Sequence, residues 1–386
     1  MKRAVLGELC DFFNGGAWSD KEYVNAGIPV LKVTNCKSTG FQLDGLNYLS
    51  EKSREKYKKN ELVIGDVIIA TVGSHPNLIE SAAGRSCIVN SQVEGFYLNQ
   101  NAVCVRTKDK KVLSQKYLGY LCKCADFQHY IQSRGRGAAN QMRIAISSIK
   151  EYSFTLPDIQ NQHYIADILS TYDDLIENNQ RQIKLLEEAA QRLYKEWFVD
   201  LRFPGHENTK IVDGVPEGWR RGLLKELISV NYGKDHKKVP DDGNIPVYGS
   251  GGLMRKCNKS LFSGEAVLIP RKGSLNNIMY VDETFWTVDT MFYATMKQPH
   301  TAVFVYFFVK AFDMYSMNIG AAVPSMTTKI LDAMDVVIPD KETLEKFDKR
   351  AKLYFNKIKT LQGQNERLKT ARDLLLPKLM SGEVEV

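Results

Sequence analysis

Two stretches of this chain repeat apolar side chains at alternating spacings of four and three residues, the heptad pattern of helices that pair. The first covers residues 157–202 and has one polar position, Asn179; the second covers residues 339–380 and has two, Asn365 and Arg372. A helix of about 37 residues spans roughly 55 Å, and it cannot bury so long a stripe alone. We therefore expect two long helices that form an antiparallel coiled coil, with Asn179 opposite Asn365 to fix the register.

The rest of the sequence is duplicated as well, because five short phrases recur in the same order. The pairs are Ile28-Pro29-Val30 with Ile245-Pro246-Val247, Gly65-Asp66-Val67 with Gly264-Glu265-Ala266, Gly137-Ala138-Ala139 with Gly320-Ala321-Ala322, Pro157-Asp158 with Pro339-Asp340, and Asn179 with Asn365. A constant frame that carries loops of variable length is typical of a binding surface built twice. The predicted fold is α+β: two mixed α/β globular domains separated by the two long helices, with an internal pseudo-two-fold repeat.

Proline and glycine mark the boundaries between these parts. Pro157 and Asp158 open the first helix, with the Asp158 carboxylate as its N-cap, and Pro204-Gly205 ends it. Within the first domain, residues 114–132 are expected to form one helix. The expected parts are a first domain at 1–156, a first long helix at 157–202, a linker and second domain at 203–338, and a second long helix with a tail at 339–386.

Composition limits the class of protein. With 44% hydrophobic and 25% charged residues the chain is globular, and its net charge of +7 suits an anionic partner, although such a charge is also common in proteins without one. Seven cysteines, an odd number without a regular framework, predict reduced thiols, and Cys122, Cys124 and His129 lack the spacing of a zinc site. The sequence has no signal peptide and no apolar run of membrane-spanning length, so we expect a cytoplasmic protein without a bound metal.

Catalytic motifs are missing from the sequence. It has no phosphate-binding Gly-x-x-x-x-Gly-Lys-Ser/Thr loop, no Gly-x-Gly-x-x-Gly fingerprint, no Gly-x-Ser-x-Gly elbow and no Asn-Pro-Pro-Tyr tetrapeptide of amino-methyltransferases. Asp109-Lys110-Lys111 provides an Asp-x-Lys, but no Pro-Asp pair precedes it to complete a nuclease site. We therefore expect a chain that is not an enzyme and binds no cofactor itself.

Basic loops provide the candidate nucleic-acid contacts. Residues 132–143, which we name the arginine loop, contain three arginines and no acid, and arginine, asparagine and glutamine pair bidentately with guanine or adenine edges. The candidates are Lys32, Asn35, Arg134, Arg136, Asn140, Gln141 and Arg143 in the first domain, and Lys234, Lys237, Arg255, Lys256, Arg271 and Lys272 in the second. The same compositions also fit ordinary solvated turns, so composition leaves both interpretations open.

The order of these parts resembles the specificity subunit of type I restriction-modification enzymes. The resemblance covers essentially the whole chain, because its phrases extend from the N-terminal domain to the C-terminal helix. They are Ile28-Pro29-Val30 with Asn35, Gly65-Asp66-Val67-Ile68, the stretch from Arg181 to Phe198, Phe203-Pro204-Gly205, Pro216-Glu217-Gly218-Trp219, Asn244 to Gly249, and Leu375 to Gly382.

This resemblance implies a non-catalytic subunit whose two target-recognition domains each bind one half of a bipartite DNA target, with the helices setting the gap. It also implies two methyltransferase subunits that use S-adenosylmethionine to methylate adenine, and restriction subunits that use ATP and magnesium. The helices are the expected docking surface for the methyltransferases, through outer residues such as Tyr194, Phe198 and Phe355. The alternatives are a coiled-coil scaffold whose repeated domains bind protein, and an enzyme with an unrecognised site.

Overall fold

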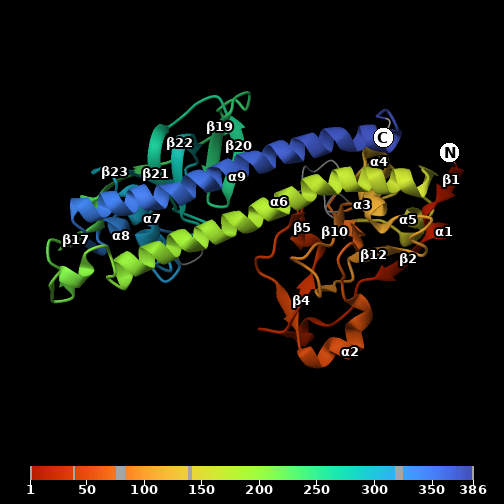
Figure 1. Cartoon of the computed structure of the whole chain (residues 1–386), viewed down its shortest axis with the longest axis horizontal. Coiled ribbons are helices and arrows are strands. Elements are labelled where there is room, and N and C mark those ends of the chain that lie inside the picture. Colours follow the sequence, from red (N-terminus) through yellow and green to blue (C-terminus); the bar gives the residue numbers. More distant parts are fainter. Residues whose placement is uncertain (1, 38–39, 75–82, 138–140, 318–324, 385–386) are drawn as a thin grey trace. The chain divides into compact units, whose positions relative to one another are not determined.

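The computed structural model describes residues 2–37, 40–74, 83–137, 141–317 and 325–384 (Figure 1). The chain forms two compact units. Unit 1 comprises Met1–Glu177 and Asn365–Val386, and unit 2 comprises Asn178–Gln364. Each unit therefore contains a globular domain and a part of each of two long helices, α6 (Ile159–Tyr194) and α9 (Lys341–Ser381).

Unit 1 is a mixed α/β domain with two four-stranded sheets, in the orders β10-β8-β12-β2 and β11-β4-β7-β3. Its strands are β1 (Lys2–Val5), β2 (Cys10–Asn14), β3 (Tyr23–Val24), β4 (Ile28–Leu31), β5 (Cys36–Lys37), β6 (Gly40–Phe41), β7 (Asn47–Leu49), β8 (Val67–Ala70), β9 (Val72–Gly73), β10 (Ser86–Ile88), β11 (Tyr97–Leu98), β12 (Ala102–Thr107), β13 (Met142–Arg143) and β14 (Ser153–Leu156). Its shorter helices are α1 (Leu6–Leu9), α2 (Arg54–Tyr57), α3 (Gln115–Lys123), α4 (Ala125–Ser133) and α5 (Ile146–Lys150).

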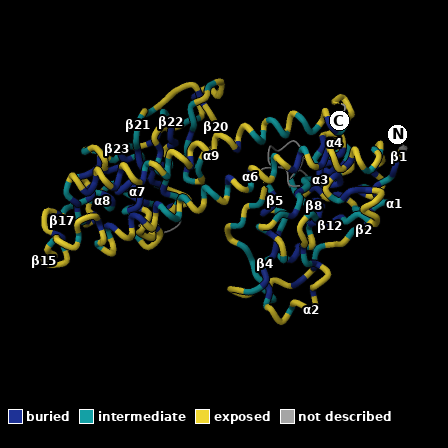
Figure 2. The backbone as a smooth tube through the Cα atoms, viewed as in Figure 1, coloured by how far each residue is buried: buried dark blue, intermediate teal, exposed yellow. Residues whose placement is uncertain are grey.

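Unit 2 contains one six-stranded sheet in the order β18-β23-β21-β22-β19-β20. Its strands are β15 (Ile211–Val212), β16 (Val215–Pro216), β17 (Arg220–Leu223), β18 (Ile228–Tyr232), β19 (Ile245–Gly249), β20 (Gly252–Cys257), β21 (Phe262–Pro270), β22 (Met279–Thr287), β23 (Met291–Met296) and β24 (Asp335–Ile338). Helix α7 (Ala302–Lys310) is almost entirely buried (Figure 2), and α8 (Thr328–Asp332) follows it.

The two units repeat one topology. The sheet order β2-β12-β8-β10 in unit 1 matches β18-β23-β21-β22 in unit 2, and the nine-residue helices α3 and α7 follow the matching strands β12 and β23. A short antiparallel pair, β1 with β14 or β17 with β24, precedes the long helix in each unit. This arrangement confirms the predicted mixed α/β class and the internal repeat.

The long helices begin at matching aspartates. The Oδ1 atom of Asp158 accepts a hydrogen bond of 2.9 Å from the backbone N–H of Asn161, and Oδ1 of Asp340 accepts one of 2.9 Å from Thr343. These bonds satisfy N–H groups that have no partner inside the first turn of a helix. The predicted N-cap at Asp158 is confirmed, and the second helix has the same cap.

Each unit buries both long helices against its own domain, where they run in opposite directions. In unit 1 the core includes Ile165 and Leu169 of α6 together with Leu379 of α9. In unit 2 the ring of Phe347, in α9, lies 6.3 Å from the ring of Tyr194 and 5.8 Å from that of Trp197. The start of one helix therefore lies beside the end of the other, as predicted for an antiparallel pair.

The end of the first long helix differs from the expected regular helix. Regular α-helix stops at Tyr194 and continues as a π-helical turn over Lys195–Val199. The wider turn places the adjacent rings of Trp197 and Phe198 in the same core, 5.8 and 4.7 Å from the ring of Phe347. The burial of both aromatic side chains explains why this turn is stable in unit 2.

The prediction of one helix over residues 114–132 is wrong, because the chain breaks at Cys124. Helices α3 and α4 meet there, and Cys124 has extended backbone angles (φ −66°, ψ 153°). The carbonyl of Cys122, which faces the break, accepts hydrogen bonds from Oγ of Ser86 (2.8 Å) and Nε2 of Gln128 (2.7 Å). These side-chain donors compensate for the helical bond that the break removes.

All seven cysteine thiols are buried, which predicts low reactivity. Burial raises the pKa of Cys10 and Cys104 to about 12, so both stay protonated at neutral pH, and the thiolate is the reactive form. We expect a disulfide-exchange reagent at pH 8 to modify none of the thiols in the folded chain and all seven in guanidinium. Rapid modification of any thiol in the folded chain would contradict this expectation.

Candidate nucleic-acid interface

The arginine loop of unit 1 is a hairpin that leaves α4 and returns along β9. Its two arms are joined at Arg136 and Arg143, whose backbones exchange two hydrogen bonds of 2.9 and 2.8 Å. The returning arm, β13, then pairs with β9, with Met142 opposite Gly73 and Arg143 opposite Val72. The loop is thus held on one side by α4 and on the other by the strand that follows β8.

Two glycines allow the arms of this hairpin to approach closely. A Cβ atom on Gly135 would lie 2.3 Å from the sulfur of Met142, and one on Gly137 would lie 2.3 Å from the carbonyl oxygen of Gln141. Gly137 also has φ of +130°, in the left-handed region that side chains disfavour. Glycine is therefore required at Gly137 by conformation and by the nearby backbone, whereas a Cβ at Gly135 would displace the side chain of Met142.

Arg136 and Arg143 form a pair of like charges on one face of the hairpin. Residues directly opposite in an antiparallel ladder project to the same side, and like charges in that position repel. Both side chains are exposed, and within the described part of the chain neither makes an ion pair. Such a pair is stabilised by an external anion, and guanidinium groups bind a phosphate or the edge of a guanine.

The other predicted residues of the loop flank this pair. Arg134 is exposed, with its guanidinium 5.0 Å from the centre of the Tyr130 ring, and Gln141 is exposed next to Met142. Asn140 lies outside the described residues. The structure thus brings three of the predicted arginines into one hairpin, and one of them, Arg134, lies over an aromatic ring of the same unit.

In each unit the end of a buried strand, β8 or β21, is hydrogen-bonded to the chain that returns towards the long helix. We name this arrangement the junction. In unit 1 the backbone N–H of Ile144 donates to the carbonyl of Thr71 (2.8 Å); in unit 2 the N–H of Met326 donates to the carbonyl of Arg271 (2.9 Å). Lys272 forms a backbone bridge with Ser325, as Val72 does with Arg143. Each unit therefore aligns the end of a buried strand with the chain that returns towards the long helix.

The sequence analysis did not identify residues 72–74, the segment of this junction that follows β8 in unit 1. Residues Val72-Gly73-Ser74 and Lys272-Gly273-Ser274 share a Gly-Ser pair, two hundred positions apart and shortly after the repeated phrases that begin at Gly65 and Gly264. Extending the comparison of these phrases to Ser74 and Ser274 would have identified the segment. Its first position is apolar in unit 1, where the loop supplies arginines, and basic in unit 2.

Arg271 and Lys272 occupy that junction in unit 2. The guanidinium of Arg271 lies 5.5 Å from the centre of the Tyr232 ring, and its Nη1 donates to the carbonyl of Asp289 (3.3 Å). Lys272 is exposed, and the Tyr232 side chain is 55% exposed. A cation over an exposed ring offers both a charge and a stacking surface to a nucleic acid.

The remaining basic residues of unit 2 differ in whether their side chains are exposed or hydrogen-bonded within the unit. Lys234, Lys237 and Lys256 are exposed. Arg255 instead donates through Nη2 to the carbonyls of His236 (2.5 Å) and Val239 (2.9 Å). Its geometry favours a role in holding the loop that carries Lys234 and Lys237 over direct contact with a base.

Asn35 is similarly committed to its own loop in unit 1. Its side chain is 8% exposed; Oδ1 accepts from the backbone N–H of Lys32 (2.9 Å), and Nδ2 donates to the carbonyl of Gln42 (2.9 Å). These bonds favour a structural role for Asn35. Lys32 lies nearby, with Nζ 5.0 Å from the centre of the Tyr23 ring.

An exposed apolar pair was also missed. Leu253 and Met254, on edge strand β20, are 60% and 53% exposed and precede Arg255 and Lys256. Apolar side chains beside basic ones are typical of wedges that enter a base step. The sequence signal was available, since the four residues directly follow the turn at Gly251-Gly252.

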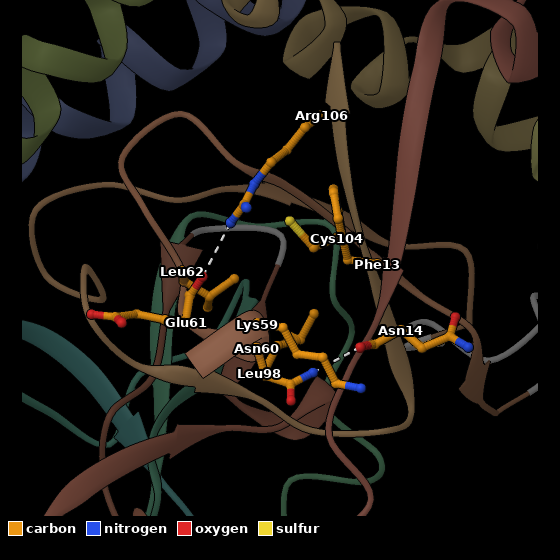
Figure 3. Close-up of a pocket in the computed structure, with 9 residues that line it drawn as sticks. All are labelled: Phe13, Asn14, Lys59, Asn60, Glu61, Leu62, Leu98, Cys104 and Arg106. Carbon is orange, nitrogen blue, oxygen red and sulfur yellow. Dashed lines mark hydrogen bonds between the residues drawn. The ribbon is translucent and has the colours of Figure 1, made fainter. Parts of the chain in front are cut away.

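The hollow in Figure 3 is structural. It is lined by Phe13, Asn14, Lys59, Asn60, Glu61, Leu62, Leu98, Cys104 and Arg106, and leaves no room for a ligand. Asn60 Nδ2 donates to the carbonyl of Asn14 (2.8 Å) and Arg106 Nη2 to that of Glu61 (3.1 Å). Elsewhere in the described ranges, no three His, Cys, Asp or Glu side chains form a group that could hold a metal ion.

Asn179 and Asn365, the predicted register residues, are buried, with exposed fractions of 8% and 5%. Both lie on the apolar stripes of their helices, where a polar side chain is costly unless it is hydrogen-bonded. Their pairing stays a prediction.

Among the helices that the structure describes, none combines the length and the apolar composition needed to span a membrane.

The chain thus combines a repeated α/β domain, a basic junction in each copy and two long helices. The family model of the type I restriction modification DNA specificity domain matches residues 1–188 and 216–370. These matches include most of the chain, which therefore belongs to this family, whose function is the recognition of DNA targets. Specificity subunits are in general non-catalytic.

The chain is similar to several named specificity subunits. It is 26% identical over 312 residues to the type I restriction enzyme MjaIX specificity subunit of Methanocaldococcus jannaschii, covering 70% of this chain and 69% of that protein. It is 21% identical to the type I restriction enzyme HindI specificity subunit of Haemophilus influenzae, covering 96% of each. The crystal structure of the S subunit from M. genitalium has the same fold, with a TM-score of 0.59, 19% identity and coverage of 98% and 95%.

Proposed function

We propose that this chain binds a bipartite DNA target, with one half-site bound at the basic junction of each unit. The observation that carries the proposal is the repetition of that junction: Arg136 and Arg143 face outward in unit 1, and Arg271 and Lys272 occupy the matching place in unit 2. Two similar sites in one chain suit two half-sites of one duplex. The available contacts are Lys32, Arg134, Arg136, Gln141 and Arg143 in unit 1 and Lys234, Lys237, Lys256, Arg271 and Lys272 in unit 2.

The proposal includes partners that supply the chemistry. Two methyltransferase subunits, with S-adenosylmethionine, would methylate adenine in each half-site, and restriction subunits, with ATP and magnesium, would cleave DNA, all in the cytoplasm. The expected docking residues Tyr194, Phe198 and Phe355 are not outer residues, because their rings pack in or against the core of unit 2. Other apolar side chains of the long helices, such as Leu185 and Leu353 at 63% and 67% exposure, support a docking role for these helices instead. The chain itself would bind none of these cofactors.

The direct test is a map of methylated adenines in DNA exposed to the chain and its methyltransferase partner. We expect one split motif that is methylated in both halves. We also expect DNA binding to weaken steeply as the salt concentration rises, because phosphate contacts release counterions. Binding without sequence preference, or a continuous motif without a gap, would overturn it. Salt-insensitive capture of a protein partner with no preference for any duplex would favour the scaffold alternative.

Replacing Arg136 or Arg143 with alanine is expected to relax the motif in one half-site only. Loss of a bidentate arginine contact costs about 1–3 kcal/mol of discrimination, or roughly tenfold to a hundredfold. The half-site that is read by unit 2 should stay unchanged in the methylation map. Arg54→Ala is the matched control, since Arg54 is a surface arginine of the same unit paired with Glu51 (2.8 Å) outside the loop. Equal effects of all three substitutions would contradict the assignment.

Replacing both Asn179 and Asn365 with leucine is expected to raise the melting temperature. Exchange of buried polar groups for apolar ones of similar volume is often stabilising, by about 1–4 kcal/mol, while it removes the groups that select one register. Calorimetry would measure the first effect, and the uniformity of the target gap in the methylation map the second. A lower melting temperature with an unchanged gap would contradict the register role.

A further inference from the structure

The two units differ sharply in chemistry at one matching place, where the helix that follows the sheet meets both long helices. Three pairs of positions correspond through the repeat. Helices α3 and α7 have equal lengths and are preceded by Ser114 and Thr301, so Tyr120 corresponds to Phe307. Between its aspartate cap and its asparagine, α9 has four more residues than α6, so we align the helix starts on the caps and the helix ends on the asparagines. Asp173 then corresponds to Phe355, and Leu186 to Arg372.

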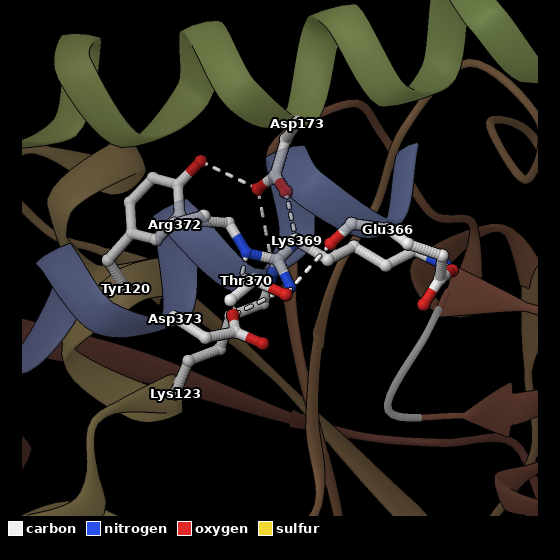
Figure 4. Close-up of polar contacts among 8 residues, drawn as sticks. All are labelled: Tyr120, Lys123, Asp173, Glu366, Lys369, Thr370, Arg372 and Asp373. Atoms are coloured by element: carbon white, nitrogen blue, oxygen red, sulfur yellow. Dashed lines mark hydrogen bonds and ion pairs between the residues drawn. The ribbon is translucent and has the colours of Figure 1, made fainter. Parts of the chain in front are cut away.

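In unit 1 this place is a charged network (Figure 4). Arg372 of α9 donates to Oδ1 of Asp173 in α6, and the hydroxyl of Tyr120 in α3 donates to Oδ2 of the same carboxylate (2.7 Å). Lys123 Nζ lies 3.7 Å from that carboxylate. The side chains of Arg372 and Asp173 are only 17% and 29% exposed. The three elements are therefore joined through one largely buried carboxylate.

In unit 2 the three matching positions carry apolar side chains, although the hydroxyl of the neighbouring Tyr280 donates to Glu265 (2.5 Å). The ring of Phe307 in α7 lies 6.1 Å from the ring of Phe355 in α9, and Phe355 also lies 4.8 Å from the ring of Tyr280. Leu186 of α6 is half-buried. Lys310, which corresponds to Lys123, donates instead to the hydroxyl of Tyr306 (2.7 Å). Hence the unit has no carboxylate at the place of Asp173.

The difference matters because only unit 1 is completed by a helix end from a distant part of the chain. Unit 1 includes residues 365–386, the end of α9, whereas unit 2 is the continuous segment 178–364, which contains the end of α6. Since the units repeat one fold, the end of α6 from a second copy could compete for the same place on unit 1. That end would present Leu186 where α9 presents Arg372, and Asp173 would stay buried beside leucine.

We propose that Asp173 and Arg372 are a pairing key that admits the end of α9 to unit 1 and excludes the end of α6 from a second copy of this chain. Removing one partner of a buried ion pair is strongly unfavourable, whereas replacing the whole group by well-packed apolar side chains is tolerated. The end of α6 is therefore excluded because it has no arginine to pair with Asp173. This role does not depend on whether the chain binds DNA.

The test compares the wild-type chain with a triple variant, Tyr120→Phe, Asp173→Phe and Arg372→Leu, which gives unit 1 the side chains of unit 2. Chains carrying two different tags are unfolded, mixed and refolded together, and native mass spectrometry counts the dimers that contain both tags. We expect the wild type to refold mainly as monomers, and the triple variant to form mixed dimers about tenfold more often. Glu366→Ala, which removes an exposed ion pair with Lys369 on the same part of α9, should match the wild type.

A second variant exchanges the chemistry of the two units completely. It adds Phe307→Tyr, Phe355→Asp and Leu186→Arg to the triple variant, so that each unit again differs from the other. We expect mixed dimers to return to the wild-type level. A triple variant that stays as monomeric as the wild type, or a complete exchange that keeps the dimers, would overturn the proposal.

Stability provides a further readout if the larger variants do not fold. Asp173→Arg places two cations together and should increase mixed dimers and lower the melting temperature, while Asp173→Arg with Arg372→Asp restores an opposite pair and should reverse both effects. A double variant that forms as many mixed dimers as the single one would also overturn the proposal.

Discussion

Replacing Arg106 with alanine is expected to lower the free energy of unfolding by about 3–5 kcal/mol, the usual cost of leaving a buried charge without its partner. In unit 1 the Nε and Nη2 atoms of Arg106 donate to the two oxygens of Asp66, at 2.7 and 2.6 Å. The Asp66 side chain is only 3% exposed and also accepts from the backbone N–H of Val63 (2.9 Å). Alanine would remove both guanidinium bonds and leave this carboxylate inside the domain.

The hydrogen bonds to Asp66 also raise the pKa of Arg106, so the guanidinium stays charged. Because the Arg106 side chain is 33% exposed, water can enter the space it leaves, and we expect a value near the lower end of the range. Guanidinium unfolding followed by circular dichroism would measure it. Arg106→Lys keeps the charge but not the bidentate geometry and should retain part of the stability.

The control for this prediction is a salt bridge of the same residue types at the surface. Arg54 pairs with Glu51 at 2.8 Å, but their side chains are 47% and 62% exposed. Exposed pairs contribute about 0–1 kcal/mol, so Arg54→Ala should change stability little. If the two alanine variants lost equal stability, burial of Asp66 would not be the cause.

Residues 40 positions apart, such as Asp66 and Arg106, show what the sequence could not reveal. The heptad stripes predicted both long helices, and Asp158 predicted the start of the first, because these signals depend on neighbours within a few residues. The bond between Asp66 and Arg106 depends on the alignment of strands from separate parts of the chain. No local periodicity encodes that alignment.

The interruptions of helices illustrate the same limit. Apolar residues continue on both sides of Cys124, so the pattern predicts one helix, yet Ser86 stabilises the break from a strand 36 residues before Cys122. The π-helical turn at Lys195–Val199 likewise depends on the ring of Phe347, far along the chain. Side chains distant in the sequence thus determine both the break at Cys124 and the π-helical turn, and the local helix propensity does not prevent either.

The candidate interface was predictable in part. Composition selected the arginines of the arginine loop, and the structure leaves Arg134, Arg136 and Arg143 exposed. It equally selected Asn35 and Arg255, whose side chains are hydrogen-bonded to backbone groups of other residues in the same unit. Whether a polar side chain is available for DNA depends on the fold, which composition does not reveal. The junction that aligns Val72 with Arg143 and Lys272 with Ser325 required strand pairing, although the repeated Gly-Ser that follows each strand pointed to it.

Lengthening both long helices by four residues is expected to widen the gap between the two DNA half-sites by about two base pairs. The prediction rests on the proposed function, in which α6 and α9 set the distance between the recognition sites. Four helical residues add roughly 6 Å, and each base pair of duplex spans about 3.4 Å. Inserting four alanines after Glu177 in α6 and four after Gln364 in α9 places the change where each helix passes between the units. The altered gap would be read from methylated adenines in DNA exposed to the variant and its methyltransferase partner.

A series of insertions makes this prediction quantitative. Seven residues in each helix, roughly 10.5 Å, should widen the gap by about three base pairs while preserving the heptad stripe. The matched control inserts four residues at the turn of Asp213 and Gly214, between β15 and β16, where both residues have positive φ and no long helix is changed. Its gap should equal that of the wild type. Both half-sites should keep their sequences in every variant, because the junctions at Arg143 and Lys272 are untouched. A constant gap across the series, in variants that still methylate DNA, would show that the helices do not measure the distance between the half-sites.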